Sequence, residues 1–152
     1  MPRSSLALLT LVMTAAPCSA QLVVQGVRDL DFGPVLQGVD QSVSPTDPVR
    51  SGQFYFSTPG IGTRIRIRLT LPSRLNGPGG AQMRIRFGPN DAMAQGTGPT
   101  SLPAFFNPNS NVNYTMVTSA DANIWLGGTV QPAANQPVGT YTNTVVLTVT
   151  VF

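Results

Sequence analysis

The chain contains no lysine, no glutamate and no histidine, and charged residues make up only 10% of it. The absence of histidine excludes a serine–histidine catalytic pair and an imidazole metal site. The absence of lysine excludes the usual Schiff-base nucleophile. All nine basic residues are therefore arginine, and all six acidic residues are aspartate. With so few bases and nucleophiles, we expect a protein that is not an enzyme and that needs no metal or cofactor.

Cysteine is almost as scarce, because the single one, Cys18, lies within the first 20 residues. That segment has the features of a signal peptide: Arg3 gives it a positive start, residues 6–16 form an apolar run, and small residues precede Gln21. We therefore expect residues 1–20 to be removed on export. The alternative is a transmembrane anchor, but the apolar run is shorter than the roughly 20 residues that span a bilayer. We expect no transmembrane segment after the signal peptide is removed. The remaining chain has no cysteine, which excludes disulfides and thiol catalysis.

Glycine and proline are abundant, with 15 and 14 residues, and they separate short segments in which apolar and polar residues alternate. Such alternation, when rich in β-branched residues, predicts strands with one buried face. The clearest cases are residues 63–71, 82–88 and 139–152. The whole pattern predicts one domain, residues 21–152, built as an all-β antiparallel sandwich of about 7–9 strands. We expect residues 63–71 and 82–88 to pair, and residues 89–110 to form a long loop.

The segment from Gly139 to Phe152 gives the strongest strand signal in the chain. Successive side chains of a strand point to opposite faces, and threonine occupies most of one face here. The other face is mostly apolar and is expected to face the core; it carries Tyr141, Val145, Leu147, Val149 and Val151. This segment is therefore predicted to be a core strand.

Arginines alternate with apolar residues in two of the predicted strands, at Arg64, Arg66, Arg68, Arg84 and Arg86. If the two strands pair, the five guanidinium groups form one patch. Guanidinium groups suit sulfate, phosphate and carboxylate, which favours a secreted binding module that recognises an anionic polymer. The alternative is that these charges only keep an exposed strand from associating edge to edge.

Three smaller features have both a functional and a structural interpretation. Asp29 and Asp31 share a strand face, where they could hold a hard cation or act as an acid–base pair; the alternative is a solvated strand face. Phe105 and Phe106 lie in the predicted loop, where exposed rings could form a platform for sugars. Trp125 stands between apolar neighbours and is expected in the core.

Three motifs resemble a known bacterial family: Leu30–Gly33 (LDFG), Trp125–Thr129 (WLGGT) and Pro137–Phe152. Together they resemble DUF4402 domains, and the last is also similar in pattern to spore coat protein U and to archaic chaperone–usher pilin subunits. The resemblance implies an immunoglobulin-like sandwich that is exported and has a structural role. Its location would be the periplasm, the cell surface or the exterior of a bacterium.

In chaperone–usher pilins, the subunit lacks its last strand and the N-terminal extension of a neighbour fills the groove by strand addition. The resemblance therefore implies identical or related subunits, and a periplasmic chaperone, as partners. The resemblance makes residues 139–152 the candidate assembly strand as well as a core strand. Gly139 matches a glycine that these subunits carry 14 residues from the end, whereas the aromatic residue is the last one, Phe152, rather than the next to last. The candidate donor strand is short and carries Leu22, Val24 and Val27.

Overall fold

The computed structural model describes residues 21–152, and the predicted signal peptide lies outside the described residues. The described chain forms twelve strands and one 3-10 turn. In chain order the elements are β1 (Val23–Arg28), β2 (Gln41–Val43), β3 (Gly52–Ser57), β4 (Arg64–Thr70), β5 (Arg74–Asn76), η1 (Pro78–Gly80), β6 (Gln82–Arg86), β7 (Ala92–Gly96), β8 (Ala104–Phe106), β9 (Val112–Thr115), β10 (Asp121–Leu126), β11 (Gly128–Gln131) and β12 (Val146–Val151).

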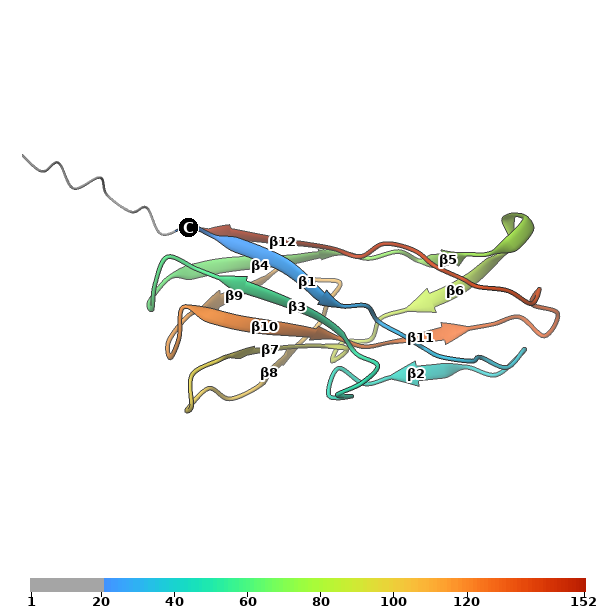
Figure 1. Ribbon diagram of the computed structural model, residues 1–152, viewed down its shortest axis with the longest axis horizontal. Helices are drawn as coiled ribbons and strands as arrows, with labels where there is room; N and C mark the ends of the chain where they lie inside the picture. The colour runs from blue at the N-terminus through green and yellow to red at the C-terminus, as the bar shows by residue number, and fades with distance from the viewer. Residues whose placement is uncertain (1–20) are drawn as a thin grey trace, which may run out of the picture.

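The strands form three antiparallel sheets (Figure 1). Sheet A has the strand order β1-β3-β10-β7-β8, sheet B the order β2-β11-β6-β5, and sheet C the order β12-β4-β9. The prediction of an all-β antiparallel sandwich is confirmed. The strands outnumber the predicted seven to nine partly because β2, β5 and β8 are only three residues long and give little alternation to detect.

β4 shows why the alternating segments fold as they do. Ile65, Ile67 and Leu69 are buried, whereas the arginines between them are exposed, so the strand has one core face and one solvent face. Pro72 follows shortly after the strand and has no backbone N–H to donate to a ladder. The chain then resumes as β5, whose Leu75 again packs against the core.

β4 and β5 lie in one layer, because the terminal segment runs along both of them. β12 pairs with β4 over its whole length, from Val146 to Val151. Nearer the start of this segment, the backbone of Thr142 pairs with Asn76 of β5. Figure 1 shows β12 and the chain before it following the β4–β5 side of the molecule.

The core consists of three clusters of buried side chains that share partly buried neighbours. Phe54, Phe106 and Leu147 pack against two of the clusters, and Leu30 and Phe87 also link two clusters. The largest fully buried apolar side chains come from several strands and from the adjoining loops: Phe56, Ile65, Ile67, Met116, Ile124, Leu126 and Val130. Burial of this apolar surface is the main source of stability for a fold that has no cysteine among its described residues.

Two sequence-based expectations about this architecture are wrong. The strands at 63–71 and 82–88 do not pair: β4 lies between β12 and β9, and β6 lies between β11 and β5. The interpretation of residues 89–110 as one loop is also wrong, because β7 and β8 form a hairpin there. In β7, Ala92, Met93 and Ala94 are all buried, so this strand lacks the alternation that marks a half-buried one.

The expectation that Trp125 lies in the core is also wrong. The buried residues of β10 are Ala122, Ile124 and Leu126, and Trp125 lies on the other face, where it is half-buried. Among residues 21–152, the structure contains no helix with the length and apolar character needed to cross a membrane.

Candidate functional site

β1 is an edge strand whose backbone is paired but whose side chains are largely exposed. It pairs with β3 alone in the described chain, and a β-bulge follows Gly26. The exposed fractions of Val23, Val24 and Val27 are 47%, 40% and 52%. Leu22, just before the strand, is half-buried against the core. The predicted donor residues are therefore held by little apolar burial.

The end of β1 is fixed more firmly than its start. The Arg28 guanidinium donates hydrogen bonds to the carbonyl oxygens of Ser51, at 2.8 Å, and Pro48, at 2.5 Å. It also donates to the Ser51 hydroxyl at 2.9 Å. The chain is thus anchored at Arg28, while residues 21–25 rely on their ladder with β3.

The next segment, Asp29–Gly33, leaves sheet A and forms one wall of a groove. Its backbone is held by a hydrogen bond from the Asp31 N–H to the Arg50 carbonyl, 2.9 Å long. The Asp31 carboxylate accepts a bond of 2.7 Å from the Gly33 N–H and so closes a tight turn. Gly33 has a φ of 65°, which glycine adopts without strain. The described residues contain no cluster of three acidic or other metal-binding side chains, at Asp29 and Asp31 or elsewhere.

The opposite wall is the segment 137–145, which leads into β12. Tyr141 is half-buried against the core, and its hydroxyl donates a 2.7 Å bond to the Pro137 carbonyl. The Gln136 amide donates to the same hydroxyl at 2.7 Å. The Tyr141 ring also lies so close to Gly77 that a side chain at position 77 would collide with it.

The predicted assembly strand continues from this wall with a graded burial. Val145 and Leu147 are half-buried, Val149 is buried, and Val151 is exposed at the end of the ladder. Phe152 is also exposed, and the Arg66 guanidinium lies 5.4 Å from the centre of its ring. Gly139 is tightly placed, because an added Cβ would lie 2.5 Å from the Pro78 ring.

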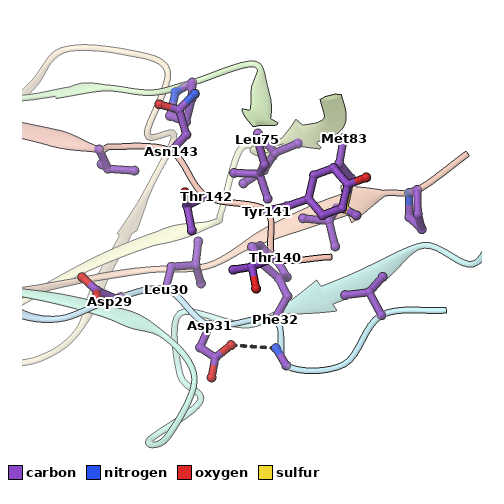
Figure 2. Close-up of a pocket in the computed structure, with 18 of the residues that line it drawn as sticks. Asp29, Leu30, Asp31, Phe32, Leu75, Met83, Thr140, Tyr141, Thr142 and Asn143 are labelled. Atoms are coloured by element: carbon purple, nitrogen blue, oxygen red, sulfur yellow. Dashed lines mark hydrogen bonds between the residues drawn. The ribbon is translucent and has the colours of Figure 1, made fainter. Parts of the chain in front are cut away.

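Between the two walls lies an open groove with a volume of about 1120 Å³. Figure 2 shows Asp29–Phe32 on one side and Thr140–Asn143 on the other. We call this space the edge groove, and define it by the walls 29–33 and 137–145. Apolar side chains from several strands and from both walls line it, among them Leu30, Phe32, Phe54, Leu75, Met83, Ile85 and Val145.

The backbone of the wall 137–145 presents an open edge. Thr142 uses its N–H and C=O to pair with Asn76, in bonds of 2.9 and 2.8 Å. In an extended chain the neighbouring residues point these groups to the opposite edge. The backbone N–H and C=O groups of Tyr141 and Asn143 make no hydrogen bond within residues 21–152. A strand placed in the edge groove would find donors and acceptors there.

The structure therefore brings together only part of the predicted assembly site. Tyr141 and Val145 line the edge groove, whereas Leu147, Val149 and Val151 lie beyond it on β12, against β4. Leu22, Val24 and Val27 lie on or beside β1, outside the groove lining. The sequence interpretation missed the apolar lining, including Leu75 and Met83. Alternation marked Met83 as apolar-facing but gave no sign that a groove opens over it.

The five predicted arginines are divided between two sheets. Arg64, Arg66 and Arg68 lie on β4 in sheet C, and Arg84 and Arg86 lie on β6 in sheet B. All five are exposed, on faces turned away from the core.

The aromatic candidates form no platform together. Phe105 is exposed on the edge strand β8, and Phe106 is half-buried against the core.

Two side chains of the described residues, Tyr55 and Asp47, have shifted pKa values. A hydrogen bond of 2.9 Å from the Tyr55 hydroxyl to the Asp121 carboxylate raises the pKa of Tyr55. Backbone N–H groups of Arg50 and Val49 donate to the Asp47 carboxylate and lower its pKa.

No family model, no curated protein and no solved structure matches this chain.

Proposed function

We propose that this protein is an exported, non-enzymatic structural subunit, similar to a pilin, that assembles with identical or related subunits by strand addition. The observation that carries the proposal is the edge groove: an apolar lining beside a backbone edge with open hydrogen-bonding positions at Tyr141 and Asn143. An added strand gains main-chain hydrogen bonds along such an edge and places alternate side chains in the apolar lining.

The occupant that we propose is the β1 segment of a second copy. This segment carries Leu22 and Val24 at alternate positions, and β1 is the part of sheet A whose side chains have the least burial to lose. Release from β3 would break a single ladder, and insertion in a neighbour's groove would bury Leu22 and Val24. The predicted export and the periplasmic chaperone that the family resemblance implies both fit this role, because an open strand edge needs protection before assembly.

The test separates acceptor from donor. The acceptor is the chain that starts at Gly26, which keeps both walls of the edge groove, and the donor is a labelled peptide of residues 21–28. We expect saturable binding, measured by fluorescence anisotropy. A peptide with Leu22→Ser and Val24→Ser should bind at least about tenfold more weakly, because it loses the apolar burial of two side chains. Equal binding of the two peptides would refute the proposed donor.

A second pair of variants tests the groove itself. Val145→Arg places a charge in the lining and should abolish binding of the peptide, since an arginine there would be desolvated by the added strand. Val117→Arg adds the same charge at an exposed position after β9 and should leave binding unchanged. Circular dichroism of both variants checks that each one folds. If Val145→Arg binds the peptide as tightly as Val117→Arg, the strand is added elsewhere.

A further inference from the structure

A row of arginines lies on the outer face of β4, away from the edge groove. Arg64, Arg66 and Arg68 are exposed at alternate positions, so their Cα atoms follow one another at about 7 Å. Their cross-strand neighbours are neutral hydrogen-bonding residues. Arg66 and Arg68 lie opposite Thr150 and Thr148 of β12.

The other side of the row is also neutral. On β9, Asn113 lies opposite Arg66, and its side-chain oxygen accepts a 3.3 Å bond from the Arg66 guanidinium. Thr115 lies opposite Arg64. None of the three strands of sheet C contains an aspartate. The positive charge of this sheet face therefore has no acidic residue beside it in the ladder.

The row continues in the neighbouring sheet of the same layer. On β5 and β6, Arg74 and Arg84 face each other directly across the ladder. Like charges at such a pair destabilise a sheet, and neither strand contains an aspartate. We call Arg64, Arg66, Arg68, Arg74 and Arg84 the arginine face. Arg86 stands at its margin, where it lines a small hollow together with Asp40 and Asp91.

Protection of a sheet edge does not explain this arrangement. Charged residues guard edge strands against unwanted pairing. β4 and β6, however, have neighbours on both sides, and four of the five arginines of the arginine face lie on them. Uncompensated charge on two central strands points instead to an anionic partner that supplies the missing negative groups.

We infer that the arginine face binds an acidic polysaccharide, a sugar chain that carries carboxylate or sulfate groups. The guanidinium fork matches both groups geometrically. The threonine hydroxyls beside the row can exchange hydrogen bonds with sugar hydroxyls. A single-stranded nucleic acid fits less well, because its binding sites stack bases on several aromatic rings. Within residues 21–152, Phe152 is the one ring that lies against an arginine of this face, at Arg66.

Equilibrium binding of the chain 21–152 to heparin and to polygalacturonate, with neutral dextran as a control, tests this inference. The wild type should bind both acidic polymers and release them as salt is raised. The triple change Arg64→Gln, Arg66→Gln and Arg68→Gln should raise the Kd about tenfold or more. It should also flatten the dependence of log Kd on log salt by roughly one per arginine removed. No binding by the wild type would overturn the inference.

A matched pair of single variants separates a site from general charge. Thr148→Asp places a carboxylate opposite Arg68 and should weaken binding several-fold. Asn135→Asp changes the net charge equally at an exposed residue of a loop and should not. Equal weakening by both would show attraction by net charge alone and would refute the site. Urea unfolding of each variant confirms that the fold is retained.

Two competitors decide the class of partner. Single-stranded DNA and vesicles containing phosphatidylglycerol are expected to bind more weakly than the polysaccharides at equal salt. If the DNA or the vesicles bind more tightly than the polysaccharides, and the triple variant loses that binding, then that ligand and not a polysaccharide is the partner of the arginine face. The chain that starts at Gly26 keeps the whole arginine face and should bind the polymers unchanged. This result is independent of strand addition, so failure of one proposal leaves the other intact.

Discussion

Removal of residues 21–25 should lower the free energy of unfolding by less than about 2 kcal/mol, although it deletes half of β1. Val23 and Val24 keep 47% and 40% of their surface exposed, so each contributes about 1 kcal/mol of the 1.5–3 that full burial gives. The half-buried Leu22 adds a similar amount, and the ladder hydrogen bonds add about 1 kcal/mol each. Ordering five residues opposes these terms with about 1 kcal/mol or more each, so the sum lies near zero.

Urea unfolding followed by circular dichroism measures this difference. With a slope of about 1–3 kcal/mol per molar urea, a loss of 2 kcal/mol shifts the midpoint by about 1 M. Phe56→Ala is the reference for an integral part of the core, because Phe56 is fully buried and its truncation should remove about 3–5 kcal/mol. A loss on removal of residues 21–25 as large as that of Phe56→Ala would refute the reasoning. β1 would then be too strongly held to act as a donor.

Three further predictions concern single residues. The hydrogen bond to Asp121 raises the pKa of Tyr55 above its ordinary value of 10.0. The bond therefore stabilises the fold below pH 10, and this stabilisation is lost as the pH rises through the raised pKa. Tyr55→Phe should be less stable than wild type at pH 7, and the difference between the two should shrink at alkaline pH. The pKa of Asp47 is lowered from 3.8, so the ionised carboxylate stabilises the fold above pH 4. This stabilisation is lost as the pH falls through the lowered pKa. Asp47→Asn has no carboxylate to protonate, so the variant should lose less stability than wild type between neutral and acid pH. Gly77→Ala forces the Tyr141 ring aside and should destabilise by about 1–3 kcal/mol in thermal unfolding.

Each of these predictions has a contrasting control. Absorbance of tyrosinate should show Tyr55 titrating above pH 10, and a titration at pH 10 or below would contradict the assigned bond. An acid unfolding curve that is identical for wild type and Asp47→Asn would exclude the role of its backbone hydrogen bonds. Gly26→Ala meets no atom within 4 Å and should be neutral or slightly stabilising. If it destabilises as much as Gly77→Ala, the ring contact is not the cause.

The sequence predicts strands well where one face is buried and the other is exposed to solvent. β4 follows its alternation of isoleucine and arginine residue by residue, and Val149 is buried as its parity requires. β7 could not be predicted in the same way, because Ala92 and Ala94 are small and the strand has no solvent face to mark. Alternation reports burial of one face, so a strand segment in which successive residues are buried, such as Ala92–Ala94, gives no such signal.

Pairing and the site depend on contacts between distant segments, which periodicity does not specify. The expected pair of β4 and β6 fails because the short β5 takes the place beside β6 and the terminal segment takes the place beside β4. The edge groove arises because the walls 29–33 and 137–145 stay apart. The arginines of the arginine face could be found by composition and parity, whereas the direct opposition of Arg74 and Arg84 required the register.

The position of β4 also has a consequence for how fast this fold forms. Its two ladder partners come from residues 112–115 and 146–151, so no local hairpin can complete sheet C. Domains dominated by such long-range pairing fold in milliseconds to seconds, because large loops must close before the contacts that reward closure are made. During that interval the isoleucines of β4 have no neighbouring strand, and this is the period in which chains of this protein are most prone to associate with one another.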